Sequence, residues 1–156
     1  MTFLNTKDSK IEFIEYKMSS TQSITGGDQI IKLDSTTKRT TGGDAVSYNS
    51  TTGVLTLSSS RRYWVQASIF YDRNSNAGYS IEWVTDSSMS EVTQTSGGFR
   101  AIVQVTANVS GYYRTSNHTA HLLVDNPTNA YRLNYGNGPS GDILTQTNMF
   151  IIEARD

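Results

Sequence analysis

The feature that most constrains this sequence is a series of short segments in which apolar and polar residues alternate. The clearest segment is residues 62–71, where every odd position is apolar. Successive side chains of a β-strand point to opposite faces, so this pattern predicts a strand with one buried face. Trp64 and Phe70 fall on the other face. No window sustains a 3.6-residue period with caps at both ends, and the chain is therefore predicted to be all-β.

Similar but shorter strands are expected along the rest of the chain. They are predicted over residues 11–17, 29–33, 45–48, 54–57, 78–84, 99–105, 119–124, 130–135 and 149–153. The turn at residues 49–53 ends in Gly53, which supplies the positive φ that tight turns need. Residues 62–71 and 78–84 are interpreted as a hairpin closed by the polar segment Asp72–Ala77. Many short strands at this spacing indicate a sandwich, a jelly roll or a barrel.

Length and composition indicate one folded domain. A chain of 156 residues fits a single domain, and no linker divides it. We expect an N-terminal arm over residues 1–10 and one domain over residues 11–156. Nine Tyr, five Phe and two Trp supply core material. The absence of cysteine excludes disulfides, thiolate zinc sites and cysteine nucleophiles.

Charge and hydropathy argue against two classes of partner. The 13 basic and 14 acidic residues are spread along the chain, without the basic stripe that phosphate backbones require. The first residues lack a basic segment followed by an apolar run, and no segment approaches the roughly 20 apolar residues that span a bilayer. We therefore expect neither nucleic acid nor membrane as a partner.

Candidate metal ligands are few. His118 and His121 are the only histidines, in a segment interpreted as a loop leading into a strand. Residues three apart on a strand point to opposite faces, so the two histidines are not expected to share a metal. Residues 72–78 resemble a calcium loop, but the glycine comes one place late and Trp83 stands where a glutamate is needed. No metal or other cofactor is predicted.

Catalytic motifs are absent from the sequence. It contains no Gly-x-Ser-x-Gly elbow, no phosphate-binding Walker loop and no His-Glu-x-x-His pattern. We predict a non-enzymatic protein with no catalytic or cofactor-binding residues. Asn49, Asn108 and Asn117 fit the N-glycosylation pattern, which chance explains in a chain so rich in Ser and Thr.

The order of these features resembles the C1q/TNF-like family. One match is Tyr48-Asn49-Ser50-Thr51-Thr52-Gly53-Val54-Leu55-Thr56-Leu57 followed by Arg62-Tyr63-Trp64-Val65. The second runs from Ser116 to Val124 and through a turn to Ala130-Tyr131-Arg132-Leu133, and Phe150-Ile151-Ile152 is placed like the family's last strand. The resemblance covers about residues 10–154. The family's Phe-Ser-Gly-Phe motif is replaced by Thr147-Asn148-Met149-Phe150, and the collagen-like stalk is missing.

The resemblance implies a ten-strand jelly-roll sandwich that forms a homotrimer through one sheet. Its Ser/Thr/Asn-rich strands and N-terminal arm are similar to small bacteriophage virion proteins. We therefore predict a virion structural protein, a capsid decoration or cement protein whose partners are the major capsid protein or other virion proteins. Residues 1–10 would clamp neighbouring capsomers.

Two alternatives remain open. One is a receptor-binding knob of a head or tail fibre, with host recognition by loops Asp72–Ala77 and Gly136–Gly141. The missing stalk favours decoration over a knob. The other is a carbohydrate-active or carbohydrate-binding module, which would need exposed aromatic side chains grouped on one face.

Overall fold

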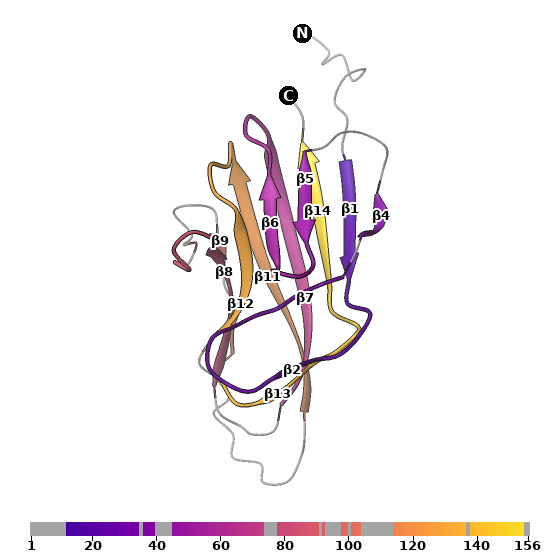
Figure 1. Cartoon of the computed structure of the whole chain (residues 1–156), viewed down its shortest axis with the longest axis vertical. Helices are drawn as coiled ribbons and strands as arrows, with labels where there is room; N and C mark the ends of the chain where they lie inside the picture. The colour runs from indigo at the N-terminus through magenta and orange to yellow at the C-terminus, as the bar shows by residue number, and fades with distance from the viewer. Residues whose placement is uncertain are drawn as a thin grey trace, which may run out of the picture.

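The computed structural model shows two antiparallel β-sheets packed face to face (Figure 1). It describes residues 12–34, 36–39, 45–73, 78–90, 92, 98–99, 101–103, 114–136 and 138–154. The first sheet has a central series of five strands, in the order β4 (Thr36–Arg39), β1 (Glu12–Lys17), β14 (Asn148–Ala154), β7 (Arg62–Arg73) and β11 (Arg114–Asp125). The second sheet has five in the order β5 (Val46–Asn49), β6 (Val54–Leu57), β12 (Tyr131–Gly136), β8 (Tyr79–Thr85) and β10 (Ala101–Val103).

Four short strands extend these two series. In the first sheet, β13 (Gly141–Ile143) pairs with the end of β7 and with β2 (Gln22–Ile24), and β9 (Gly98–Phe99) pairs with β11. In the second sheet, β3 (Gln29–Ile30) pairs with β12. The described part of the chain contains fourteen strands, four more than the ten predicted, in the all-β arrangement of two antiparallel sheets that a jelly roll has. The predicted fold class is thus confirmed.

The core lies between the sheets and follows from the alternation in the strands. Every odd position of β7 from Tyr63 to Arg73 is buried, whereas Trp64 on the opposite face is exposed. In the second sheet, Ile81 and Trp83 of β8 are at most 2% exposed. Both strands therefore turn their apolar faces to the same core, as in aligned sandwich packing.

The predicted hairpin of residues 62–71 and 78–84 is wrong. Strand β7 pairs with β11, β13 and β14, and β8 pairs with β10 and β12. Two strands that follow each other in the sequence favour a hairpin locally. Here they lie in different sheets, and each buries its apolar side chains in the core between the sheets. Of the proposed closing turn Asp72–Ala77, the first two residues belong to β7 and residues 74–77 lie outside the described part of the chain.

The other strand predictions are confirmed to different extents. The hairpin of β5 and β6 is present, and Gly53 has a φ of 74°. Strand β11 begins at Arg114, so the interpretation of Asn117 and His118 as loop residues is wrong. Strands β2, β4 and β13 were not predicted. The expected arm over residues 1–10 lies outside the described residues. Within the described ranges, no helix has the length and apolarity to cross a membrane.

Candidate functional site

A row of apolar side chains crosses the outer face of the first sheet. Phe13 of β1 is in register with Ile152 of β14. Ile152 is in register with Trp64 of β7, and Trp64 with Leu123 of β11. Residues in register on antiparallel neighbours place their side chains on one face. We call these four residues the apolar row.

The apolar row leaves large side chains in contact with solvent. Trp64 is 46% exposed and Leu123 is 50% exposed. Phe13 packs against Phe150 with ring centroids 5.5 Å apart. A shallow hollow of about 180 Å³ is lined by Phe13, Trp64, Gln66, Phe150 and Ile152. Exposed apolar side chains grouped in this way make this face a candidate interaction surface.

Polar groups border the apolar row along the strands. Toward one end of the sheet, Arg62 Nε lies 3.3 Å from Asp125 Oδ1. A row of polar residues in register lies four positions away along the strands, in the opposite direction. It consists of Lys17, Asn148, Ser68 and Thr119. An apolar centre inside a polar border is the usual arrangement of a protein–protein interface.

His121 lies beside the apolar row and orients its largest side chain. Trp64 Nε1 donates a hydrogen bond to His121 Nδ1 at 3.2 Å, and the two rings stack with centroids 6.1 Å apart. Because Nδ1 accepts this bond, it carries no proton in this contact. An indole already held in one position loses less conformational entropy when a partner covers it.

The two histidines lie on opposite faces of β11, as their spacing predicts. His118 is half-buried and its Nε2 forms a hydrogen bond with the Tyr79 hydroxyl. Burial, and to a smaller degree the charge of Arg73, lowers the pKa of His118 below its usual 6.5. Among the residues whose positions are described, no group of three or more His, Cys, Asp or Glu side chains could hold a metal ion.

A cluster of tyrosines closes the core near the end of β7. The Tyr71 and Tyr135 hydroxyls are 2.9 Å apart, and both donate to the carbonyl oxygen of Pro139. Burial raises the pKa of both hydroxyls, so they stay protonated. The loop Gly136–Gly141, a candidate recognition loop, is therefore anchored to the interior at Pro139.

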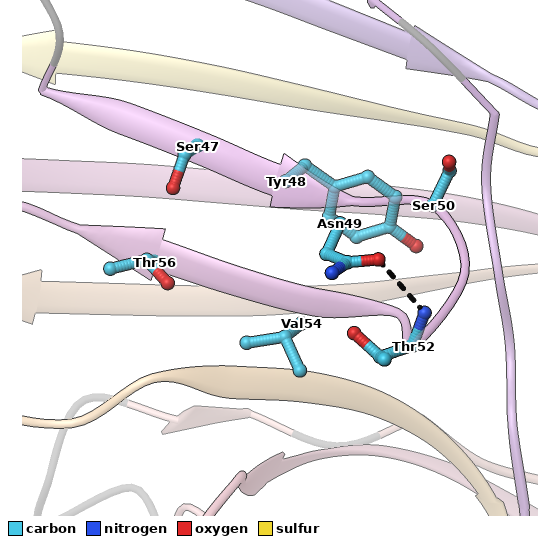
Figure 2. Close-up of a pocket in the computed structure, with 7 residues that line it drawn as sticks. All are labelled: Ser47, Tyr48, Asn49, Ser50, Thr52, Val54 and Thr56. Atoms are coloured by element: carbon cyan, nitrogen blue, oxygen red, sulfur yellow. Dashed lines mark hydrogen bonds between the residues drawn. The ribbon is translucent and has the colours of Figure 1, made fainter.

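Figure 2 shows a polar trough on the β5–β6 hairpin, on the outer side of the second sheet. It is lined by Ser47, Tyr48, Asn49, Ser50, Thr52, Val54 and Thr56. Burial raises the pKa of Tyr48 to about 12, and its hydroxyl oxygen accepts a hydrogen bond from the Leu33 amide. The trough thus offers neutral hydroxyl and amide groups, which suit hydrogen bonding and not acid–base chemistry.

The glycosylation patterns fall on structurally different positions. The Asn49 side chain accepts a hydrogen bond from the Thr52 amide at 3.1 Å (Figure 2). It accepts a second one from the Thr51 amide at 3.0 Å, and the two bonds close the β5–β6 turn. Asn117 is an exposed residue of β11, and Asn108 lies outside the described residues. Asn49 is therefore explained by turn geometry.

Sequence reasoning found only one member of the apolar row. The alternation in residues 62–71 placed Trp64 on the outer face. Phe13, Ile152 and Leu123 come from segments distant in the sequence, and only the strand order brings them beside Trp64. The weak signal available was an apolar residue on the otherwise polar side of a strand, as with Leu123 in β11, whereas the outer side of β14 is itself mostly apolar.

Comparison with known proteins identifies the fold. No family model and no curated protein matches the sequence. The two sheets define a C1q/TNF-like jelly roll, and similar solved structures bear this out. Two of these are crystal structures of murine APRIL, a TNF-family protein. The one at pH 8.5 has a TM-score of 0.57 at 7% identity, covering 94% of this chain and 100% of that one. The one at pH 8.0 has a TM-score of 0.59 at 7% identity, covering 92% and 99%. At this identity the similarity concerns the fold alone.

Proposed function

We propose that this chain is a non-enzymatic structural domain that forms a homotrimer through the outer face of its first sheet. The observation that supports the proposal is the apolar row, in which Trp64 and Leu123 are each about half exposed. A symmetric assembly would cover these side chains and leave the polar border at its edge. The C1q/TNF-like fold supports a trimer over other symmetries, because the resemblance of the sequence implies that assembly.

We further propose that the trimer is a bacteriophage virion component that decorates the capsid. The support is the resemblance of the polar strands to small virion proteins, together with a second sheet whose outer side stays free for other contacts. In this proposal the first sheet holds the trimer together and other surfaces contact the capsid protein. A decoration trimer binds assembled shells only, so it would stabilise them by mass action.

The alternative of a receptor-binding knob has one observation in its favour. The hydroxyl-rich trough of the β5–β6 hairpin lies on the second sheet, away from the apolar row. It would remain open to solvent in a trimer built on the first sheet. Neutral hydrogen-bonding groups such as those of Ser47 and Asn49 suit sugar hydroxyls, so host glycans are the ligands that this alternative predicts.

The test combines solution mass with capsid binding. Light scattering should give a mass near three times 17.2 kDa for the native chain. Trp64→Lys places a charge in the apolar row and should yield monomers. Met89→Lys is the matched control, because Met89 is 44% exposed but lies outside the first sheet. A monomeric native chain contradicts the proposal.

Incubation with capsids stripped of minor proteins then separates the two roles. Binding by the native trimer, lost with Trp64→Lys, supports decoration. A trimer that ignores capsids but binds host cells, and loses cell binding with Ser47→Arg in the trough, supports the receptor knob instead.

A further inference from the structure

Arg73 is a buried cation with two donor atoms that lack partners. The residue is only 5% exposed, and its Nε and Nη1 atoms are buried without a hydrogen-bond partner. Buried polar groups are almost always hydrogen-bonded, and an uncompensated buried charge is strongly destabilising. The Arg73 guanidinium would therefore be stabilised by an anionic oxygen that accepts hydrogen bonds from these two nitrogens.

The position of Arg73 places this group between the sheets, at one end of the sandwich. Arg73 is the last residue of β7 and lies on its core-facing side, where Tyr71 precedes it. The guanidinium carbon lies 6.0 Å from the centre of the Tyr79 ring in the second sheet. The same tyrosine contacts His118 through its hydroxyl. The guanidinium thus packs against the Tyr79 ring, close to the Tyr79 hydroxyl and the His118 imidazole.

The protein itself does not supply a counter-ion within the described residues. Asp72, the neighbour of Arg73, alternates to the other face of the strand, where it is in register with Asp142. On the side of β13, Arg73 is in register with Gly141, which has no side chain.

The strand on the other side of Arg73 places no acidic residue opposite it. At this position of β11 the backbone partner of Arg73 is Arg114. The low pKa of His118, to which Arg73 contributes, is consistent with a positive potential at the same place.

We propose that Arg73 anchors a binding site for a small oxyanion, a carboxylate or a phosphate, at the end of the sandwich beside Tyr79 and His118. The guanidinium would donate to the anion's oxygens, as arginine does with both groups. The Tyr79 hydroxyl and the His118 ring would border the anion, and the aromatic ring would limit access of water. The site is separate from the apolar row and does not depend on the oligomeric state.

Thermal unfolding in three salts tests the site. The native chain would be unfolded in sodium acetate, sodium phosphate and sodium chloride at equal ionic strength. A free anion at ten times its Kd raises the ratio of folded to unfolded chains about elevenfold. For a chain of this size the expected rise in Tm is about 3–6 °C. A response to acetate alone identifies a carboxylate site, and a response to phosphate alone identifies a phosphate site.

Two variants separate binding from general salt effects. Arg73→Met removes the charge and keeps an apolar side chain of similar length, so it should lose the anion-specific rise. Arg132→Met is the matched control, because Arg132 is paired with Asp86 on the second sheet. The proposal is overturned if Arg73→Met shows the same rise as the native chain, or if neither anion exceeds chloride.

A measurement on the native chain covers the case in which Arg73→Met does not fold. In proton–nitrogen NMR spectra, the Nε–H signal of Arg73 is identified by its contact with the Tyr79 ring. This signal should shift and saturate during titration with acetate or phosphate. A signal that stays in place throughout both titrations also overturns the proposal.

Discussion

Replacing Trp64 by alanine is the sharpest test of the apolar row. Trp64 is 46% exposed in the single chain. A tryptophan offers about 250 Å² of surface, so roughly 115 Å² would become buried in an assembly. At about 25 cal/mol per Å² this contributes about 3 kcal/mol per protomer. The value is an upper estimate, because association also has entropic costs.

The loss acts three times in a trimer, once for each copy. The protein concentration at which half of the trimers dissociate depends on the square root of the trimer dissociation constant. A loss of about 3 kcal/mol per protomer therefore raises this midpoint concentration about a thousandfold. Sedimentation velocity over a wide concentration range measures the midpoint for the native chain and for Trp64→Ala.

The control is a residue nearly as exposed as Trp64 that lies elsewhere on the molecule. Met89→Ala removes a side chain that is 44% exposed but lies beyond the first sheet, and it should leave the midpoint unchanged. Far-ultraviolet circular dichroism checks that each variant keeps its strands. A Trp64→Ala midpoint within threefold of the native value, or an equal change with Met89→Ala, would refute the reasoning.

Three further predictions concern stability, each measured by chemical denaturation. Glu153 is fully buried and its Oε1 lies 2.6 Å from Arg61 Nη1, so Arg61→Met should lower the free energy of unfolding by about 2–3 kcal/mol; a change below about 0.5 kcal/mol contradicts this. In Gly141→Ala the new Cβ would lie 2.3 Å from the Asp72 carbonyl oxygen, and the clash should cost about 1–3 kcal/mol; native-like stability would show that the backbone adapts. Because the pKa of His118 is lowered in the folded chain, the unfolded chain binds a proton at a pH where folded His118 is still neutral. The free energy of unfolding should therefore fall as the pH drops below about 6.5, by at most about 1.4 kcal/mol per pH unit. His118→Gln should flatten this dependence, and an unchanged slope would exclude His118 as its source.

Local features of the fold were predictable from the sequence. The β5–β6 hairpin depends on a turn of a few residues and on Gly53, and both are visible in the sequence. The buried face of β7 follows from strict alternation over many residues. Strands β2, β4 and β13 were missed because they are short and polar. Pairing with neighbouring strands, and not their own composition, makes these segments extended.

The candidate sites were harder to predict because they depend on non-local pairing. Leu123 reads as one more apolar residue in a strand until β11 is set beside β7 in a known register. Arg73 belongs to a segment that resembles a polar turn, yet β7 continues through it and buries it. Sequence alternation gives the face of a residue only when the strand's length is known.

The pairing of β1 with β14 has a consequence for how the chain folds. Glu12 is in register with Glu153, so nearly the whole chain separates the two residues. Contacts between such distant segments close late and slow the folding of β-proteins. Strand β14 also fills the space between β1 and β7. The first sheet therefore cannot be completed until residues 148–154 have been made and can pair, and β1 keeps an unpaired edge open to neighbouring chains until then.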